Sequence, residues 1–301
     1  MNEIHKKIAP LVVWYNPDNE CVKNILSYSK YFEKIFIIDN SENENIELAS
    51  QIKNSVYLPL HINTGIAKAL NTGSALALKN KYEYVMTMDQ DSYFDDEDIK
   101  QFVKLLSEYI TENKYNIFCP YLKTPEITSI TDDIKNFIKR KILHRKAALK
   151  DESPVSQLDY CISSGSVISL DKWNELNGFN EDFYIDDVDH EFCLRLNQKY
   201  PFSILRFNTV FMNHKIGNEK KTFFHRTDFH NPVRLYYITR NAFYMRDIFP
   251  DFSKKYDRIK KIFRIFFEYL RIFRFKHCYY MIKGYSDYKK NIKGKLIQKT
   301  N

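Results

Sequence analysis

The chain has 301 residues, 44% of them hydrophobic and 16% aromatic, and a formal net charge of +8 at pH 7. That composition can form a sizeable core, which argues against wholesale disorder. The five cysteines are scattered, without a CxxC pair or a Cys/His cluster, so neither a disulfide framework nor a structural zinc site is expected. Apolar stretches are too short or too interrupted by charge for a signal peptide or a membrane span, and the pattern predicts a reduced, cytoplasmic protein.

The first 120 residues alternate short apolar runs with helix-like stretches, which predicts a doubly wound α/β sheet. In the stretch 65–80, for example, apolar residues share one helical face and Gly73 would allow close packing. Polar residues follow several apolar runs, and ligands of such sheets bind beyond the carboxyl ends of the strands. The predicted strands are 10–15, 34–39, 55–60, 82–88 and 115–120.

The second half of the chain continues the pattern after a charged interruption. Residues 121–157 are weakly patterned and predict an insertion with a helix at 135–150. The later predicted elements are an extended pair of strands at 158–170, helices at 171–179 and 185–199, a strand at 202–214, and a mainly helical region from 232 onward.

The basic residues concentrate at the end of the chain. Residues 251–301 contain 15 Lys and Arg against four Asp and Glu. A basic tail on a near-neutral body predicts contact with an acidic partner, either a membrane surface or a nucleic acid. Within the tail, a helix over 257–275 would place a wide apolar face beside a basic stripe, which suits an anionic membrane. Packing of that face against the body or a second subunit is the alternative.

Residues 87–92 read TMDQDS, so two aspartates, Asp89 and Asp91, follow an apolar strand directly. Unpaired carboxylates are costly inside a sheet, but at the mouth of a strand they can face a cation or a polyphosphate. His214 ends a later predicted strand, and two carboxylates with an imidazole suit Mg²⁺ or Mn²⁺. Such a metal would neutralise a diphosphate leaving group. The chain has no Gly-x-Gly-x-x-Gly motif and no P-loop, which argues against dinucleotides and ATP hydrolysis.

Taken in order, these motifs resemble the inverting family 2 glycosyltransferases, and more narrowly the bacterial rhamnosyltransferase-like branch that builds capsules, O-antigens and other surface polysaccharides. The resemblance covers about residues 9–245. It implies a GT-A fold, a Rossmann-like mixed sheet, in a catalytic domain over 1–231, followed by a helical, basic region over 232–301. The motifs are VVWYNP (12–17), IIDNS (37–41), NTGIAKALNTG (63–73), MDQDS (88–92), SSGSVIS (163–169), GFNEDFYIDDVDHEFCLR (178–195) and FMNHKIG (211–217).

The resemblance also implies roles for single residues. Asp91 and His214 would ligate the metal, and Asp89 would orient the ribose or the donor sugar. Asp189 falls on the position of the catalytic base, with Asp187 as the alternative because Val188 replaces the glutamate common there. The other residues implied to bind the donor are Tyr15, Asn16 and Pro17 at the nucleobase, Asp39 at the base or ribose, and Asn63, Gly65, Lys68 and Asn71 near the ribose or diphosphate. The residues named for acceptor contact or support are Trp173, Glu191, Arg234, Tyr236, Tyr237 and Arg240, with packing as the alternative.

These observations predict an inverting glycosyltransferase on the cytoplasmic face of the membrane, with Mn²⁺ or Mg²⁺ as cofactor. It would move a sugar, L-rhamnose from dTDP-rhamnose in the favoured interpretation, to a lipid-linked oligosaccharide. A homodimer is a further possibility, and no nucleic acid takes part. One alternative is a sugar nucleotidyltransferase, which normally carries a basic Gly-rich loop where this chain reads WYNPDNE. Another is a nucleic-acid-binding protein, which would leave the acidic residues unexplained.

Overall fold

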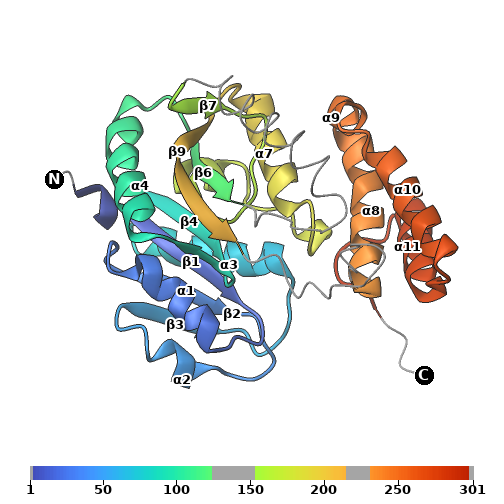
Figure 1. The fold of residues 1–301 in the computed structure, drawn as a ribbon, viewed down its shortest axis with the longest axis horizontal. Coiled ribbons are helices and arrows are strands. Elements are labelled where there is room, and N and C mark those ends of the chain that lie inside the picture. Colours follow the sequence, from blue (N-terminus) through green and yellow to red (C-terminus); the bar gives the residue numbers. More distant parts are fainter. Residues whose placement is uncertain (1–2, 124–152, 215–230, 298–301) are drawn as a thin grey trace, which may run out of the picture.

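The computed structural model describes residues 3–123, 153–214 and 231–297. The insertion helix predicted at 135–150 and the last part of the 211–217 motif lie outside these residues. The described chain folds around one mixed sheet with the strand order β3-β2-β1-β4-β8-β6-β9-β5, and β7 pairs with β9 (Figure 1). The strands are β1 (Ile8–Trp14), β2 (Ile35–Asp39), β3 (Ser55–Pro59), β4 (Tyr84–Asp89), β5 (Ser92–Phe94), β6 (Ile117–Lys123), β7 (Val155–Gln157), β8 (Ser166–Ser169) and β9 (Ile204–His214).

Strands β1 to β4 are parallel and form the half of the sheet that the apolar runs predicted. Every residue of β1 and β2 is buried, as expected for strands with helices on both faces. Trp14 pairs with Asp39, and Val13 pairs with Asp89. The carboxyl ends of these strands therefore meet at one edge of the sheet.

Two apolar cores lie on the two faces of the sheet, because successive strand residues point in opposite directions. Helices α1 and α4 cover Ile8, Val12 and Ile37 on one face. Helices α3, α6 and α7 cover Leu11 and Ile38 on the other face. The helices of the sheet region are α1 (Asn19–Ser29), α2 (Ile46–Ala49), α3 (Ile66–Lys79), α4 (Asp96–Tyr109), α6 (Leu170–Glu175) and α7 (Val188–Lys199), and the short 3-10 helices are η1 (Glu3–Lys6), η2 (Ile110–Glu112) and η3 (Glu181–Phe183).

Gly73 confirms the close packing predicted for it. A Cβ at this position would lie 2.1 Å from the Leu11 Cδ1 atom, so only glycine lets α3 approach β1 this closely.

Two predicted elements are wrong in their extent. The pair of strands predicted at 158–170 reduces to β8, because Gly165 takes a φ of 78° and the Ser166 amide bonds back to the Ser163 carbonyl in a tight turn. The helix predicted from residue 185 begins only at Val188, because Asp186 and Asp187 take φ values of 62° and 64°. Both departures lie beside the strand edge described above.

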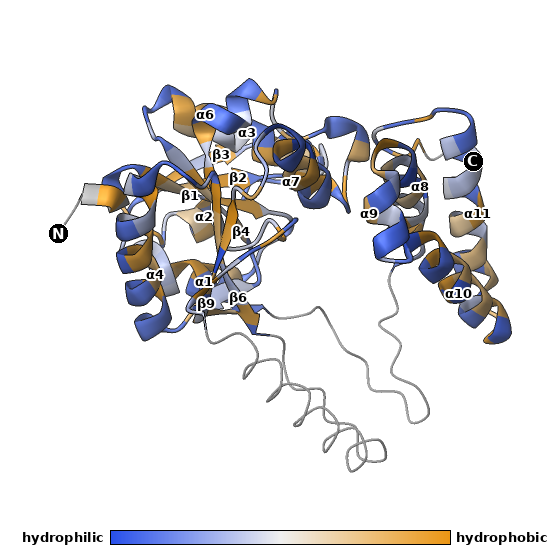
Figure 2. Cartoon of the chain, turned by 90° about the horizontal axis from the view of Figure 1, so that it is seen from above, coloured by the Kyte–Doolittle hydropathy of each residue, from blue (hydrophilic) through white to orange (hydrophobic). Residues whose placement is uncertain are grey.

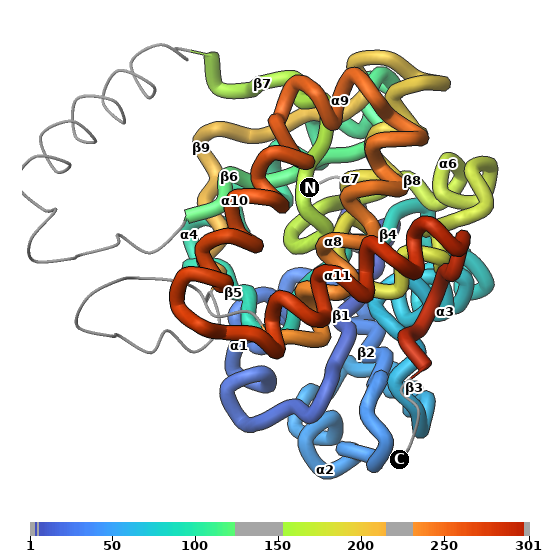
Figure 3. The backbone as a smooth tube through the Cα atoms, turned by 90° about the vertical axis from the view of Figure 1, so that its right-hand side faces the viewer, coloured from blue at the N-terminus to red at the C-terminus, as the bar shows by residue number. Residues whose placement is uncertain are grey.

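The predicted helical region at the end of the chain consists of α8 (Pro232–Ile248), α9 (Pro250–Lys255), α10 (Arg258–Arg271) and α11 (Phe275–Lys289). These helices stand together beside the sheet region, and α11 runs along α8 (Figures 1 and 3). Gly284 permits this contact, since a Cβ there would lie 2.4 Å from the Tyr236 carbonyl oxygen. Among the described residues, no helix is both long enough and apolar enough to span a bilayer.

Candidate active site

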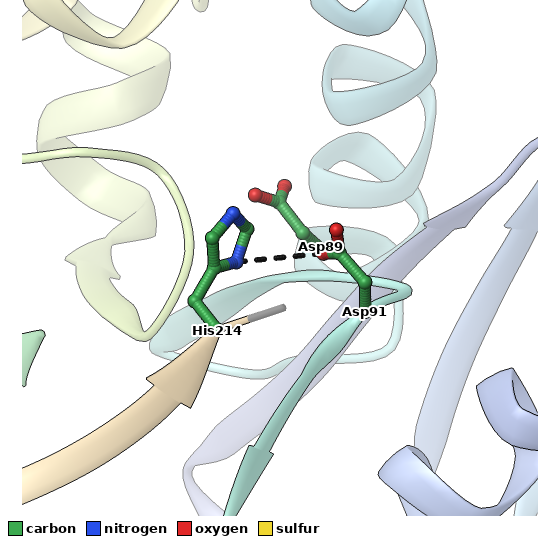
Figure 4. Close-up of side chains that lie close together, drawn as sticks. All are labelled: Asp89, Asp91 and His214. Carbon is green, nitrogen blue, oxygen red and sulfur yellow. Dashed lines mark ion pairs between the residues drawn. The ribbon is translucent and has the colours of Figure 1, made fainter. Parts of the chain in front are cut away.

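Asp89, Asp91 and His214 form a compact cluster at the carboxyl edge of the sheet (Figure 4). Asp89 ends β4 and His214 ends β9, and the pairing of Ser92 with His214 brings the two strand ends together. One ligand atom from each residue of the cluster lies within 4.8 Å of the others, and the Asp91 Oδ1 atom is 3.4 Å from the His214 Nδ1 atom. The sequence placed these three residues at the ends of predicted strands, the family resemblance implied their roles, and the fold brings them together.

The electrostatics of the cluster suit a divalent cation. Burial, together with the charge of Asp91, raises the pKa of Asp89 to about 6, against the opposing effect of His214. A cation between the carboxylates would relieve this crowding of negative charge. Two carboxylates and an imidazole are also a donor set that Mg²⁺ and Mn²⁺ accept. The residues present therefore fit the metal that the family resemblance implies.

Two serines support the cluster, and sequence reasoning missed both. The Ser92 Oγ atom is 2.7 Å from the His214 Nδ1 atom, and the Ser164 hydroxyl donates to Ser92 at 2.8 Å. The Asp89 amide donates to the same Ser164 oxygen at 3.1 Å. When the His214 Nδ1–H donates to Ser92, the Nε2 lone pair remains free for a metal.

Asp189 lies in the first turn of α7, close to this cluster. Its Oδ2 atom accepts from the Ser163 amide at 3.0 Å, and its Oδ1 atom accepts from the His190 amide at 2.8 Å. The charge of Asp189 contributes to the raised pKa of Asp89, so the two carboxylates are within electrostatic reach of each other. Two backbone amides therefore orient the Asp189 carboxylate.

Asp187, the alternative base, has a different environment. Its side chain is only 5% exposed, and both of its oxygens lie 2.5 Å from the Arg258 Nη2 atom. The His190 Nδ1 atom lies 3.2 Å away. Burial raises the pKa of Asp187, but the His190 hydrogen bond and the Arg258 charge outweigh it and hold the pKa below its ordinary value. A carboxylate paired in this way is a poor proton acceptor.

The residues predicted to line the nucleobase pocket follow β1. Tyr15 and Asn16 are exposed and Pro17 is half-buried, so all three are accessible to a ligand. Gln90, from the middle of TMDQDS, fixes this loop, because its side chain accepts from the Tyr15 amide at 2.8 Å and donates to the Tyr15 carbonyl at 3.3 Å. The same short motif thus supplies two carboxylates to the cluster and a brace to the neighbouring loop.

Asp39 is fully buried at the end of β2. Its carboxylate accepts from the Ser41 backbone amide at 3.0 Å, the Tyr57 hydroxyl at 2.7 Å and the Asn45 side-chain amide at 2.9 Å. Burial raises the pKa of Asp39, but these hydrogen bonds outweigh it and lower the pKa below its usual value. Asp39 shapes the loop that faces Asn16, whose amide donates to the Ser41 hydroxyl at 2.8 Å. Its direct contact with a base or ribose stays a prediction.

The residues predicted near the ribose and diphosphate tie α3 to the segment before α7. The Asn63 Oδ1 atom accepts from the Tyr184 hydroxyl at 2.9 Å, and a Cβ on Gly65 would lie 2.4 Å from the Tyr184 ring. Asn71 pairs with the Phe179 backbone in both directions, at 2.8 and 2.9 Å. Lys68 is half-exposed, 3.3 Å from Glu181, and remains within reach of a ligand.

The residues named for acceptor contact or support are mostly engaged inside the protein. Trp173 is buried with its Nε1 atom 3.3 Å from the Asn71 Oδ1 atom, as in the packing alternative. Glu191 is buried and forms a bidentate pair with Arg195 at 2.9 and 3.0 Å. Arg240 is fully buried and donates to the carbonyls of Gly294, Asp182 and Phe183. Tyr236 and Tyr237 are buried around it.

Arg234, in the first turn of α8, faces the cluster. Its guanidinium donates to Asp186, with the Nη2 atom 2.9 Å from the Oδ1 atom. Burial lowers the pKa of Arg234, but Asp186 and, beyond it, the charges of Asp89 and Asp91 raise it. The C-terminal helices therefore add a cation to the edge of the sheet.

Comparisons with solved structures show the fold. S. aureus TarS superposes with a TM-score of 0.53 at 14% identity, over 80% of this chain and 40% of that chain. GalNAc-T7 with UDP, GalNAc and Mn²⁺ superposes with a TM-score of 0.54 at 13% identity, over 83% of this chain and 50% of that chain. The TarS fragment 1–349 in complex with UDP-GlcNAc gives 0.52 at 15% identity, over 80% and 66%. This chain thus spans less than two thirds of each of these structures, and the fold it shares with them is GT-A.

Sequence comparison finds two similarities. The model of glycosyl transferase family 2 matches residues 19–153. The dTDP-rhamnosyl transferase RfbF of Shigella flexneri is 29% identical over 250 residues, which are 80% of each chain. The chain is therefore similar in sequence to glycosyltransferase family 2.

Proposed function

We propose that this glycosyltransferase transfers L-rhamnose from dTDP-rhamnose to a lipid-linked oligosaccharide, with inversion, in the synthesis of a bacterial surface polysaccharide. The observation that carries the proposal is the Asp89–Asp91–His214 cluster with Asp189 beside it at the carboxyl edge of the sheet. The likeness to RfbF supports dTDP-rhamnose as the donor. The neighbour solved with UDP-GlcNAc supports a nucleotide sugar as the class of donor.

The roles of the residues follow from their positions. Asp91 and His214 would hold Mn²⁺ or Mg²⁺, which supplies positive charge next to the donor diphosphate. Asp89 orients the sugar or ribose from the adjacent strand end. Asp189 accepts the proton of the acceptor hydroxyl as that oxygen attacks the anomeric carbon, opposite the departing diphosphate. Because the attack is direct, no residue forms a covalent intermediate.

The accessible residues of the donor loop complete the proposed site. The half-exposed Tyr15 ring lies against the nucleobase, beside Asn16 and Pro17, and Lys68 reaches the diphosphate. The site is also supported by contacts between α3 and the segment before α7: Asn63 and Gly65 contact Tyr184, and Asn71 bonds to the Phe179 backbone. Asp39 holds the loop at Ser41, and the Ser41 hydroxyl in turn accepts from the Asn16 amide.

Residues 232–301 form the part of the protein that meets the membrane in this proposal, and the protein lies on the inner face of the cell membrane. On α10, Phe263 is 53% and Phe267 is 61% exposed, and Phe273 just beyond it is 77% exposed. Figure 2 shows that α10 lies at the opposite end of the molecule from α4 and that apolar and polar residues alternate along it. We call the exposed Phe263, Phe267 and Leu270 of α10, together with Phe273 after its end and Phe275 at the start of α11, the α10 apolar face. Exposed Lys260, Lys261, Arg264 and Arg271 are suited to anionic lipid headgroups.

A transfer assay tests the proposed reaction. The protein, with Mn²⁺, is given dTDP-rhamnose or UDP-GlcNAc and a lipid-linked oligosaccharide, and the product is examined by NMR. We expect transfer from dTDP-rhamnose, with the anomeric configuration opposite to that of the donor. Retention of configuration would contradict the direct attack. Formation of a nucleotide sugar from a sugar phosphate and a nucleoside triphosphate would instead show a nucleotidyltransferase.

A further inference from the structure

Two consecutive aspartates before α7 have a backbone conformation that non-glycine residues rarely adopt. Asp186 has a φ of 62° and Asp187 a φ of 64°. Side chains with a Cβ are strained in this left-handed region, so other contacts must hold both residues there. The next residue but one after Asp187 is Asp189. The strained pair therefore sets the direction in which the proposed base enters the site.

The contacts that hold the pair come from the C-terminal helices. Arg234 of α8 donates to Asp186 through its Nε atom at 3.2 Å and its Nη2 atom at 2.9 Å. Arg258, the first residue of α10, contacts both oxygens of Asp187 at 2.5 Å. Asn241 of α8 donates to the carbonyls of Ile185 and Asp186, at 2.8 and 2.9 Å. Residues far apart in the sequence thus converge on the start of α7.

Arg258 is placed for this contact. Its side chain is 18% exposed, and its guanidinium also lies over the Phe252 ring, 5.5 Å from the centroid. Asp187 in turn accepts the Glu191 amide with its backbone carbonyl at 2.9 Å, which starts the first turn of α7. The His190 ring contacts the Asp187 carboxylate, and the His190 backbone amide donates to the Asp189 carboxylate. A short chain of contacts therefore leads from Arg258 to the base.

We propose that Arg258 is a positioning residue for Asp189, acting through the left-handed conformation of Asp187, with Arg234 holding Asp186 in the same way. This inference rests on the proposed role of Asp189 as base. Without Arg258, the Asp187 carboxylate loses its cation and the strained backbone can relax. The Asp189 carboxylate then moves, and a displacement of about 1 Å is enough to reduce turnover by about 10²-fold.

The first test compares Arg258→Ala with Arg246→Ala. Arg246 is a matched control, because it is an arginine of the same helical region that pairs with an aspartate, Asp247, at 2.7 Å. We expect Arg258→Ala to lower kcat by about 10- to 100-fold, with the KM for the nucleotide sugar within about threefold of wild type. Arg246→Ala should leave kcat within about twofold. An equal loss in both variants, or a loss confined to KM, would overturn the proposal.

Glycine at position 187 provides a rescue. Glycine adopts positive φ without strain and leaves no carboxylate to pair. The double variant Asp187→Gly, Arg258→Ala should therefore recover at least about tenfold of the kcat lost in Arg258→Ala, if that loss approaches 10²-fold. A double variant as slow as Arg258→Ala would show that Arg258 does not act through the backbone of Asp187.

A double-mutant cycle separates this inference from the proposed function. If Arg258 acts by placing Asp189, then Arg258→Ala should cause no further loss of kcat when position 189 is already Asn. Losses that multiply in the double variant would overturn the positioning role while leaving Asp189 as base. Wild-type kcat in Asp189→Asn alone would overturn the base itself, and the inference with it.

Discussion

Asp187 and Asp189 are two residues apart and have different chemistry because they have different neighbours. The Arg258 guanidinium pairs with the buried Asp187, whereas two backbone amides orient the Asp189 carboxylate. A general base must be ionised and able to accept a proton at the pH of the reaction. The proposed base is Asp189, whose charge acts on Asp89 at the carboxyl edge of the sheet.

Asp189→Asn tests this assignment. The substitution keeps the volume and the acceptor oxygen but removes the group that takes up the proton. We expect kcat to fall by about 10²- to 10⁴-fold, with donor and Mn²⁺ affinities unchanged because Asp89, Asp91 and His214 remain. Steady-state kinetics with isothermal titration of donor and metal would measure both effects. A nearly wild-type kcat in Asp189→Asn, with abolition in Asp187→Asn, would place the base at Asp187.

The metal site can be tested at its two proposed ligands. Asp91→Asn and His214→Ala should each weaken Mn²⁺ binding by at least about tenfold, because each removes one ligand. EDTA should abolish transfer, and added Mn²⁺ or Mg²⁺ should restore it. Asp96→Asn is the control, since Asp96 is an aspartate of α4 that pairs with Lys30 and Lys100 at 2.6 Å. Undiminished transfer in EDTA would contradict the ligand assignments.

Single residues also show how far sequence reasoning reaches. The Asp89–Asp91–His214 cluster was predictable, because each residue ends or follows a strand with a strong apolar pattern. The pairing of Asp187 with Arg258 was not, because it joins residues 71 positions apart through a side-chain contact that leaves no periodic signal. The sequence allows Arg240 as an acceptor contact but does not show that it is fully buried and donates to backbone carbonyls.

At the scale of elements, the apolar pattern located most strands but not the segments that build the site. Strands β1 to β4 and β6 lie close to their predicted positions because they are short, apolar and bounded by polar residues. Residues 158–165 are also rich in small and apolar residues, yet only their two ends bond to the sheet, Leu158 to Ile204 and Gly165 to Thr87, and no strand forms between them. The Ser163 carbonyl accepts from the Thr87 hydroxyl, and the Ser163 backbone amide donates to the Asp189 carboxylate. Local pattern cannot distinguish a strand from a segment held by such distant contacts.

The α10 apolar face can be tested without removing the helix. Deleting 251–301 would also remove Arg258 and the contact of α11 with α8, so point substitutions are the cleaner experiment. The double variant Phe263→Glu, Phe267→Glu should reduce co-sedimentation with anionic vesicles by at least about tenfold. The variant removes apolar area that would enter the membrane, and it adds negative charge. Donor affinity should not change.

Phe202→Glu is the control for that substitution, because Phe202 is 70% exposed but lies in the sheet region, just before β9. Binding should also weaken as salt rises, since the lysines and arginines of α10 attract the anionic headgroups. Unchanged vesicle binding in the double variant would argue against the membrane contact. A change from dimer to monomer in the same variant would indicate that the α10 apolar face binds a second copy.

The packing of α11 on α8 depends on Gly284. Replacing it with alanine would place a Cβ 2.4 Å from the Tyr236 carbonyl oxygen, and a backbone atom cannot rotate away. We expect Gly284→Ala to destabilise the protein by about 1–3 kcal/mol, the range for overpacking, and to lower its melting temperature. Lys289→Ala, an exposed position on the same helix, should leave the melting temperature nearly unchanged. Equal melting temperatures in the two variants would show that α11 and α8 accommodate a Cβ at position 284 without loss of stability, and would contradict the prediction.

At the scale of the whole molecule, the catalytic edge is assembled from both predicted domains. The boundary at residue 231 follows the change from strands to helices, but the side chains cross it. Arg240 and Asn241 donate to the carbonyls of residues 182–186, and Arg234 and Arg258 hold the two aspartates before α7. We therefore expect residues 232–255, and α10 at least as far as Arg258, to be required for activity even where the membrane is absent.

Donor selectivity would be a property of this whole assembly, because in the proposed site the nucleobase, diphosphate and sugar would contact different elements. A ligand that binds only the folded protein stabilises it by about 2.7 kcal/mol at 100 times its Kd. In the presence of Mn²⁺, we expect dTDP-rhamnose to raise the melting temperature more than UDP-GlcNAc at equal concentration. The metal-dependent part of the shift should disappear in Asp91→Asn but persist in Asp96→Asn. A larger shift with UDP-GlcNAc would overturn dTDP-rhamnose as the donor while leaving the fold and the family in place, since neither depends on which nucleotide fills the loop after β1.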